Sequence, residues 1–416
     1  AADNLKVVGR AGIGLDNVDA TAASKRGIVV MNTPGGNTIT TGEHAIAMML
    51  SLARKIPQAT ASMKGGKWEK NKFMGTEVFN KTLGVVGIGR VGAIVASRAQ
   101  GLKMRVVAYD PFISPEAAGN LGITLVSLDE LLKESDFITV HTPMTKETRG
   151  MINAAAFAKM KKGVFIINCA RGGIVSEKDL YDALVAGKVA GAALDVFEEE
   201  PTKNADLVGL EKVICTPHLG ASTDEAQVNV AIAIAEQVAD YLIKGEIRNA
   251  VNFPSVSAEL LTVIQPYLVL AEKLGRFHVQ LVQGGIEEVI IEYSGKILNY
   301  NVAPLTIALL KGLLTPILKE NVNFINAPVV AKERGIKVIE AKSSVVKDYT
   351  SLISLTIKTA QETSQTAGAL FGLQDPRIVQ LNKFTMDVVP LGHMLVIYNY
   401  DRPGVIGNIG STLGAN

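Results

Sequence analysis

The stretch LGVVGIGRVGAIVASRAQGLKMRVVAYD, residues 83–110, contains in order the parts of one dinucleotide-binding turn. It begins with an apolar run that predicts a buried parallel strand. Gly87, Gly89 and Gly92 follow in G-x-G-x-x-G order, and a helical pattern then leads to a second strand at Val106–Ala108. The first glycine permits a tight turn, the second lets backbone N–H groups approach a pyrophosphate, and the third lets helix and strand pack closely. The stretch therefore predicts a nucleotide-binding unit.

The residues around this turn favour one dinucleotide over the other. Asp110 lies 21 residues after Gly89, where a carboxylate accepts hydrogen bonds from a ribose. Arg90 is within reach of a phosphate, but Asp110 repels a 2′-phosphate. We therefore predict NAD rather than NADP as the cofactor.

Composition narrows the class of protein. The 416 residues carry 42 basic and 40 acidic side chains, so neither a nucleic acid nor a membrane is an expected partner. Charges interrupt every apolar stretch before membrane-spanning length, and no signal peptide precedes Lys6. Cys169 and Cys215 lie in strand-like runs and are expected to be buried thiols, which fits a cytoplasmic location. The spacing of His, Cys and acidic residues predicts no metal site.

Both ends of the sequence look like the interiors of structural elements. The first residues already continue a strand–loop pattern, and the last ones stop within a helical pattern. We expect a fragment cut at both ends.

Residues 5 to 250 alternate short β-branched runs with helical patterns. This alternation is typical of an α/β fold with a doubly wound parallel, Rossmann-like sheet. The predicted strands are Lys6–Val8, Val29–Met31, Val106–Ala108, Phe137–Val140, Val164–Asn168, Gly191–Asp195 and Val213–Cys215.

Two long helices follow T/S-x-x-E patterns that predict capping boxes. The first would start at Thr40 with Glu43 and run to about Lys55. The second would start at Ser222 with Glu225 and end near Gly245.

The composition changes near residues 249–254, which read as a linker. Beyond it we expect an α+β region with a helix around Leu268–Phe277. Its predicted strands are Glu287–Tyr293, Lys337–Ala341, Ser351–Thr359 and Phe384–Val389. Residues 393–400 are predicted to form a strand, followed by an incomplete helix.

Three residues at predicted strand ends have the chemistry to oxidise a 2-hydroxy acid. Arg171, Glu200 and His218 each follow an apolar run, and the carboxyl ends of parallel strands open onto the ligand crevice. His218 would take the hydroxyl proton, Glu200 would orient the ring and favour its imidazolium form, and Arg171 would bind a carboxylate. Each residue alone has an ordinary structural explanation, and the functional interpretation depends on finding all three in this order.

The remaining histidines carry less information. His44 and His278 lie on helical segments and are expected to be structural. His141, beside Thr142, would line the cofactor site without catalysing a reaction, and an effector role for His393 stays open.

Six motifs resemble those of the D-2-hydroxyacid dehydrogenase family, and within it the 3-phosphoglycerate dehydrogenase branch. They occur in order along the chain: VGRAGIGLDNVD (8–19), MNTPGGNT (31–38), GIGRVG (87–92), NCARGGIV (168–175), LDVFEEEP (194–201) and TPHLGAST (216–223).

The resemblance implies a catalytic set, a cofactor and a substrate site. The catalytic set falls on Arg171, Glu200 and His218, with NAD as the hydride acceptor. Besides the glycines, NAD contacts are implied at Arg90, Val91, Asp110, Thr142, Cys169, Ala170, Asp195, Gly220 and Ala221. Substrate contacts are implied at Arg10, Gly12, Asn32 and Gly35. The implied reaction is oxidation of D-3-phosphoglycerate to 3-phosphohydroxypyruvate, the first step of serine synthesis.

The resemblance also divides the chain into domains. Residues 1–33 and 223–250 would form a split, incomplete substrate domain, and 34–222 the NAD-binding domain. Residues 251–389 resemble an intervening regulatory domain, and 390–416 the start of an ACT domain that senses serine, with Asn399 and Asp401 near the effector. The family implies a homodimer or homotetramer.

Three alternatives stay open at this point. One is that the substrate is another 2-hydroxy acid, related to glyoxylate, hydroxypyruvate or lactate, because no phosphate-binding loop is visible. The second is that the chain is a non-catalytic NADH-sensing scaffold. The third is that the chain, as a fragment, binds NAD without turnover.

Overall fold

The computed structural model describes residues 4–15, 17–254, 258–318, 322–343, 349–372, 374–400 and 402–415. The chain divides into two compact units. Unit 1 comprises Ala1–Val8, Asn17–Val30 and Gly245–Asn416, and unit 2 comprises Gly9–Asp16 and Met31–Lys244. The chain thus passes from one unit to the other four times. The four-domain division predicted from the sequence stays a prediction.

Unit 2 is built on a seven-stranded parallel sheet in the order β5-β4-β3-β6-β7-β8-β9. The strands are β3 Thr82–Val86, β4 Arg105–Tyr109, β5 Thr124–Leu125, β6 Phe137–Val140, β7 Val164–Asn168, β8 Val189–Leu194 and β9 Val213–Cys215. Every residue of β3 and β6 is buried. Continuous apolar runs suit these strands because helices cover both faces of a parallel sheet.

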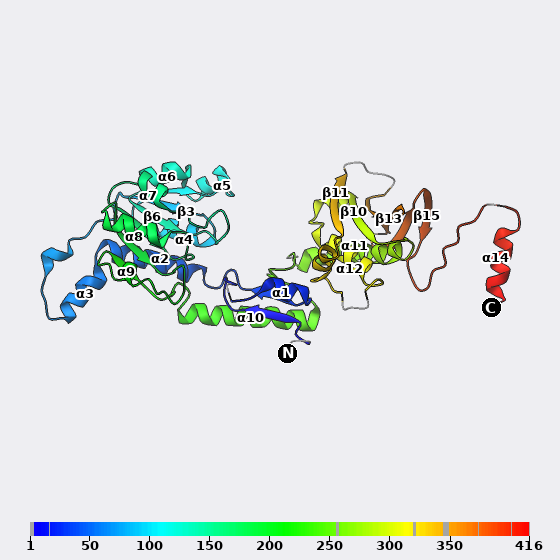
Figure 1. The fold of residues 1–416 in the computed structure, drawn as a ribbon, viewed down its shortest axis with the longest axis horizontal. Coiled ribbons are helices and arrows are strands. Elements are labelled where there is room, and N and C mark those ends of the chain that lie inside the picture. Colours follow the sequence, from blue (N-terminus) through cyan, green and yellow to red (C-terminus); the bar gives the residue numbers. More distant parts are fainter. Residues whose placement is uncertain are drawn as a thin grey trace. The chain divides into compact units, whose positions relative to one another are not determined.

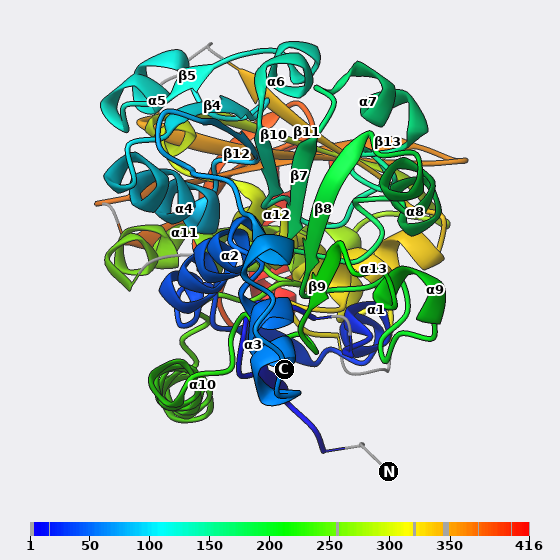
Figure 2. The ribbon, with the colours of Figure 1, turned by 90° about the vertical axis from the view of Figure 1, so that its left-hand side faces the viewer.

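The two faces of this sheet are covered by α2 Thr38–Ala53, α4 Arg90–Gly101, α6 Leu128–Glu134, α7 Ala154–Lys159 and α8 Glu177–Val185. The further helices of unit 2 are α3 Ile56–Lys64, α5 Pro115–Asn120, α9 Ala205–Val208 and α10 Asp224–Lys244, with a 3-10 turn at Lys70–Phe73. In Figure 2, α2 and α4 lie on one side of β7 and β8, and α7 and α8 lie on the other. The core is correspondingly double, with one apolar cluster against α2 and α4 and a second against α6 to α8.

The sheet reverses its winding between β3 and β6. Strand order runs one way from β3 to β5 and the other way from β6 to β9. Ligands of such sheets bind at this switch point, beyond the carboxyl ends of the strands. The doubly wound parallel sheet predicted from the sequence is confirmed.

Unit 1 contains a six-stranded sheet in the order β11-β10-β12-β13-β14-β15. Its strands are β10 Ile286–Gly295, β11 Lys337–Ser343, β12 Ser351–Thr359, β13 Thr363–Phe371, β14 Asp375–Leu381 and β15 Phe384–Val388. Its helices are α1 Ala20–Lys25, α11 Ala258–Val279, α12 Ala303–Leu314, α13 Ala327–Glu333 and α14 Val405–Gly414, with a 3-10 turn at Lys296–Asn299. Strands β10 and β11 are parallel and the other pairs antiparallel, while α11 and α12 pack together on the sheet (Figure 1). The expected α+β character of this region is confirmed.

A separate two-stranded sheet pairs β1 (Val7–Arg10) with β2 (Val29–Asn32). Among the described residues, no helix is long and apolar enough to cross a membrane.

Both predicted capping boxes are wrong. Helix α2 begins at Thr38, because the turn in which Gly36 N–H bonds Thr33 O leads into the helix before Thr40. Helix α10 begins at Asp224 after a turn from Leu219 O to Ser222 N–H, so Thr223 Oγ1 accepts the capping bond from Ala226 N–H.

Two further expectations are wrong. Residues 393–400 form no strand, since no strand of the described chain pairs with them. Cys215 is exposed rather than buried, because it is the last residue of the edge strand β9. Cys169 is buried as expected.

Candidate active site

The glycine turn after β3 gives its three glycines different surroundings. Gly87 has a φ of +94°, and a Cβ there would lie 2.9 Å from the carbonyl oxygen of His141. A Cβ on Gly92 would lie 2.0 Å from the carbonyl oxygen of Gly87, so helix α4 packs on the turn only without a side chain. No atom of the described residues lies within 4 Å of the Cβ position of Gly89, the N-cap of α4. The turn therefore presents open backbone and a helix N-terminus at the switch point, which suits a phosphate.

Asp110 lies across this turn. Its Oδ2 accepts a hydrogen bond of 2.8 Å from Ile88 N–H, inside the glycine turn, and its Oδ1 accepts one of 2.8 Å from Phe112 N–H. A carboxylate has about four lone-pair sites, so acceptor capacity is left for ribose hydroxyls. Arg90 donates to Pro34 O at 2.7 Å, which links the turn to the segment around Gly35.

The segment after β6 contributes buried polar atoms that have no partner in the described structure. These atoms are His141 Nδ1 and Thr142 Oγ1. His141 Nε2 lies 2.9 Å from Thr139 Oγ1, and burial lowers the pKa of His141 to about 4, so the ring is neutral. Buried polar atoms are normally paired. Their position beside Gly87 therefore fits a group that binds in this crevice, as a dinucleotide would.

Arg171 is fixed by the segment that follows β7. Asn168 Oδ1 accepts from Ala170 N–H at 3.1 Å, and its Nδ2 donates to Arg171 O at 3.0 Å. Arg171 itself is half-buried and donates to Ala170 O at 2.7 Å. The next residue, Gly172, packs so closely on Phe197 that a Cβ would lie 1.6 Å from the carbonyl oxygen of Phe197. The guanidinium thus stands on a tightly held loop at the carboxyl edge of the sheet.

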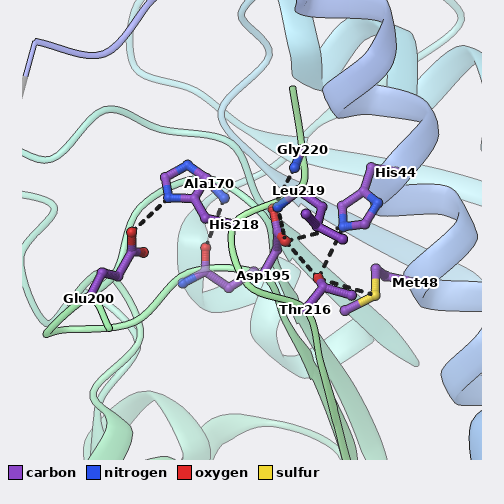
Figure 3. A network of polar contacts seen from close by, with 10 residues as sticks. His44, Met48, Ala170, Asp195, Glu200, Thr216, His218, Leu219 and Gly220 are labelled. Atoms are coloured by element: carbon purple, nitrogen blue, oxygen red, sulfur yellow. Dashed lines mark hydrogen bonds and ion pairs between the residues drawn. The ribbon is translucent and has the colours of Figure 1, made fainter. Parts of the chain in front are cut away.

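Asp195, directly after β8, organises the loop that carries His218 (Figure 3). Its side chain is fully buried. Oδ1 accepts from Thr216 Oγ1 at 2.6 Å and from Leu219 N–H at 2.7 Å, and Oδ2 accepts from Gly220 N–H at 2.8 Å. The carbonyl oxygen of Asp195 also accepts from His218 N–H at 2.9 Å. One carboxylate residue therefore fixes the loop on both sides of His218.

Electrostatics at Asp195 favour its ionised form. Burial acts to raise the pKa of Asp195, but hydrogen bonds from His44, Thr216 and Leu219 outweigh it and hold the pKa below its ordinary value. Nearby, burial and then the Asp195 charge raise the pKa of Cys169 far above its usual range. The thiol of Cys169 is therefore protonated and chemically quiet.

His218 and Glu200 form a pair. His218 Nδ1 lies 2.7 Å from Glu200 Oε2, and Glu200 Oε1 accepts from Phe197 N–H at 3.1 Å. Both side chains are partly exposed, at 46% and 38%. They line a pocket of about 520 Å³ together with Phe197, Pro201, Thr202, Val208, Cys215, Thr216 and Pro217. The pair combines a fixed ring with access from solvent, which a proton-transferring histidine requires.

The residues expected to contact substrate form a second group in unit 2. Gly12 N–H donates to Thr33 Oγ1 at 2.8 Å, and Asn32 Nδ2 donates to Ile13 O at 2.8 Å. Arg10 Nε is buried and has no partner in the described structure, so one donor of this guanidinium is available to a ligand. Among the described residues, no cluster of three or more His, Cys, Asp or Glu side chains suits a metal ion.

Three polar residues of the site were not singled out from the sequence. Asn168 shapes the Arg171 loop, Thr216 bonds Asp195, and His44, expected to be merely structural, contacts both Asp195 and Thr216. One signal in the sequence could have pointed to His44. Asp195 lies at the end of a predicted strand with no basic residue near it in sequence, and a buried carboxylate needs a basic or hydrogen-bonding partner from elsewhere in the chain.

Comparison with known protein families identifies two parts of the chain. Residues 46–220 match the model of the D-isomer specific 2-hydroxyacid dehydrogenase, NAD binding domain. Residues 263–382 match the D-3-phosphoglycerate dehydrogenase intervening domain.

Solved structures share the fold over about three fifths of the chain. D-lactate dehydrogenase from Aquifex aeolicus, complexed with NAD and lactic acid, is 34% identical with a TM-score of 0.55, covering 60% of this chain and 81% of that one. NAD-dependent formate dehydrogenase from Staphylococcus aureus, in complex with NAD, is 30% identical with a TM-score of 0.56, covering 61% and 77%.

Relatives match the chain from end to end. D-3-phosphoglycerate dehydrogenase of Archaeoglobus fulgidus is 49% identical over 100% of this chain and 79% of its own length. The Synechocystis enzyme of the same name is 48% identical over 100% and 75%, and the Bacillus subtilis one 44% identical over 99% and 79%. The chain belongs to the D-3-phosphoglycerate dehydrogenase family, within the NAD-dependent D-2-hydroxyacid dehydrogenases.

Proposed function

We propose that this protein oxidises D-3-phosphoglycerate to 3-phosphohydroxypyruvate with NAD, the first step of serine synthesis. The observation that carries the proposal is the His218–Glu200 pair, 2.7 Å apart, on a loop anchored beside the dinucleotide crevice. The names of its relatives give the substrate, and the intervening-domain match supports the same branch of the family.

His218 acts as the general base. Its Nδ1 faces Glu200, which leaves Nε2 to accept the proton of the substrate hydroxyl as the carbonyl forms. Glu200 accepts a hydrogen bond from Nδ1–H, fixes the ring and stabilises the imidazolium that results. The two electrons of the broken C–H bond leave as hydride, for which bound NAD supplies the acceptor. The substrate thus loses a hydride and a proton and becomes a 2-oxo acid.

Arg171 binds the substrate carboxylate. Its planar guanidinium presents parallel donors that match a carboxylate, and its loop is held by Asn168 and Gly172. Arg10, Gly12, Asn32 and Gly35 are proposed to contact the rest of the substrate.

The cofactor would be held by the glycine turn and the polar atoms around it. Gly87, Gly89 and Gly92 would admit the pyrophosphate, and Asp110 would accept hydrogen bonds from the adenosine ribose. The remaining proposed contacts are Arg90, Val91, Thr142, Cys169, Ala170, Asp195, Gly220 and Ala221. Asp110 favours NAD over NADP, because a 2′-phosphate would face its carboxylate.

The test is the rise of absorbance at 340 nm with NAD and D-3-phosphoglycerate at alkaline pH. A panel of alternative substrates, namely D-lactate, D-glycerate and glycolate, the reduced form of glyoxylate, is tested in the same assay. Turnover of D-3-phosphoglycerate alone supports the proposal. Turnover of another panel member reassigns the substrate within the family, and NAD binding without any turnover favours an NADH-sensing role.

Three finer proposals accompany the reaction. The protein forms homodimers or homotetramers, for which the exposed apolar side chains around α3 (Met63, Trp68, Met74 and Phe79) offer a surface. It works in the cytoplasm, where its two free cysteines stay reduced. Serine is an effector that binds near Asn399; Asp401, its predicted companion, lies outside the described residues. Light scattering, fractionation and serine titration test these three in turn.

A further inference from the structure

A histidine on helix α2 reaches the buried carboxylate beneath the His218 loop. His44 Nε2 lies 3.3 Å from Asp195 Oδ1 and 3.2 Å from Thr216 Oγ1 (Figure 3). The side chain of His44 is 18% exposed and that of Asp195 is 0% exposed. Asp195 therefore has a basic partner that comes from a different part of the chain.

The hydrogen-bond network fixes which nitrogen of His44 carries a hydrogen. Thr216 has one hydroxyl hydrogen, and its 2.6 Å bond to the Asp195 carboxylate outcompetes its 3.9 Å contact with Met48 Sδ, a weak acceptor. Thr216 Oγ1 can then only accept from His44. Nε2 of His44 is thus protonated and donates toward both Thr216 and Asp195.

The donors on Asp195 have distinct origins. Two are backbone N–H groups of the His218 loop, at Leu219 and Gly220, and one is the Thr216 hydroxyl of the same loop. His44 alone comes from α2. Its hydrogen bond therefore ties the His218 loop, through Asp195, to a helix that packs in the core of unit 2.

We propose that His44 is a positioning residue that acts through Asp195. By donating from Nε2 it keeps Asp195 ionised and directed at Leu219 and Gly220, which holds His218 in place and shapes the neighbouring cofactor contacts. The effect of His44 on turnover rests on the proposed function. The effect of His44 on the position of the His218 loop does not depend on that function.

Two matched variants test the donor. In His44→Gln the side-chain amide nitrogen is separated from Cβ by the same number of bonds as Nε2 of histidine. In His44→Asn the amide nitrogen is one bond closer to Cβ and therefore reaches less far. Both are neutral amides of similar polarity, so they differ chiefly in reach. Met49→Leu, a volume-conserving change in the core face of the same helix, controls for repacking of α2.

The first readout is hydrogen–deuterium exchange of the peptide spanning residues 214–222, measured by mass spectrometry on the full chain. We expect about tenfold faster exchange in His44→Asn and near wild-type exchange in His44→Gln and Met49→Leu. We also expect kcat of His44→Asn to fall about 10- to 100-fold, which corresponds to the loss of one hydrogen bond to the charged Asp195, with the KM for substrate little changed. Calorimetric NAD binding should weaken in His44→Asn and recover in His44→Gln.

The outcomes separate this inference from the proposed function. If the wild type turns over D-3-phosphoglycerate but His44→Asn matches it in exchange and kcat, the inference is overturned. If His44→Gln is as impaired as His44→Asn, the donor role is overturned. If no panel substrate is turned over while the two variants differ in exchange and NAD affinity, the proposed function fails and the positioning role stands.

Discussion

Substituting alanine at Gly89 and, separately, at Gly92 adds one methyl group at two positions of the same turn with opposite surroundings. At Gly92 the new Cβ would lie 2.0 Å from the carbonyl oxygen of Gly87, about 1 Å inside the shortest normal contact, and a backbone carbonyl cannot rotate away. Overpacking of this kind costs about 3 kcal/mol, and the helix preference of alanine returns about 1 kcal/mol. We expect Gly92→Ala to lower the free energy of unfolding of unit 2 by about 2 kcal/mol.

Gly89→Ala should leave stability almost unchanged. Gly89 has a φ of −73°, which alanine adopts without strain, and no atom in the part of the chain that the structure describes lies within 4 Å of the added carbon. Alanine restricts the unfolded chain, which raises the free energy of unfolding, but it is a poorer helix N-cap than glycine, which lowers it. The two effects cancel to within about 1 kcal/mol. The methyl group would instead stand where the pyrophosphate approaches the backbone. We therefore expect the Kd for NAD to rise at least about tenfold, which is about 1.4 kcal/mol.

Urea unfolding followed by circular dichroism measures the first effect, with hydrogen exchange of β3 assigning the transition to unit 2. Isothermal titration calorimetry with NAD measures the second. If Gly89→Ala binds NAD as tightly as the wild type, the glycine turn does not hold the pyrophosphate and the cofactor site has been misplaced.

Three other perturbations are readily tested. His218→Ala should lower kcat by about 10² or more in the 340 nm assay, since general-base catalysis contributes 10²–10⁴; an unchanged kcat removes His218 from the mechanism. Gly172→Ala should lower the free energy of unfolding by about 3 kcal/mol or prevent folding, because its Cβ would lie 1.6 Å from Phe197 O. A urea unfolding midpoint equal to that of the wild type would contradict this packing. Burial lowers the pKa of His278 from its ordinary 6.5 to about 4, so between these values the unfolded chain binds a proton that the folded one does not. Unit 1 should therefore lose up to about 3 kcal/mol as pH falls from 6.5 to 4, and His278→Gln should flatten this slope in urea titrations; an equal slope in both proteins would refute it.

The sequence predicted best those elements whose signal is local and continuous. The strands at Phe137–Val140, Val164–Asn168, Val213–Cys215 and Ser351–Thr359 have the predicted bounds, since each is rich in β-branched or apolar residues. Strands β13 and β14 were missed because they contain Gly368 and Pro376 and owe their formation to pairing with neighbours distant in sequence.

The candidate site divides in the same way. Arg171, Glu200 and His218 could be predicted because each lies in the loop that follows a strand, and the structure pairs His218 with Glu200. The contact of His44 with Asp195 could not, because it joins a helix and a loop 151 positions apart and depends on how α2 packs against the sheet. The mistaken capping boxes show a related limit, since a T/S-x-x-E pattern also fits the interior of a helix, as at Thr40, and the residue just before the capping residue, as at Ser222.

The four passages of the chain between the two units have a practical consequence for dissecting the protein. Neither unit is an uninterrupted stretch of polypeptide, so neither can be obtained by truncation at a single point. A protease that cuts once near Gly245 leaves an N-terminal product that still contains segments of both units. Fragments should therefore stay associated through non-covalent contacts after cleavage. Such a nicked complex would migrate as one species in a native gel and as two in a denaturing one.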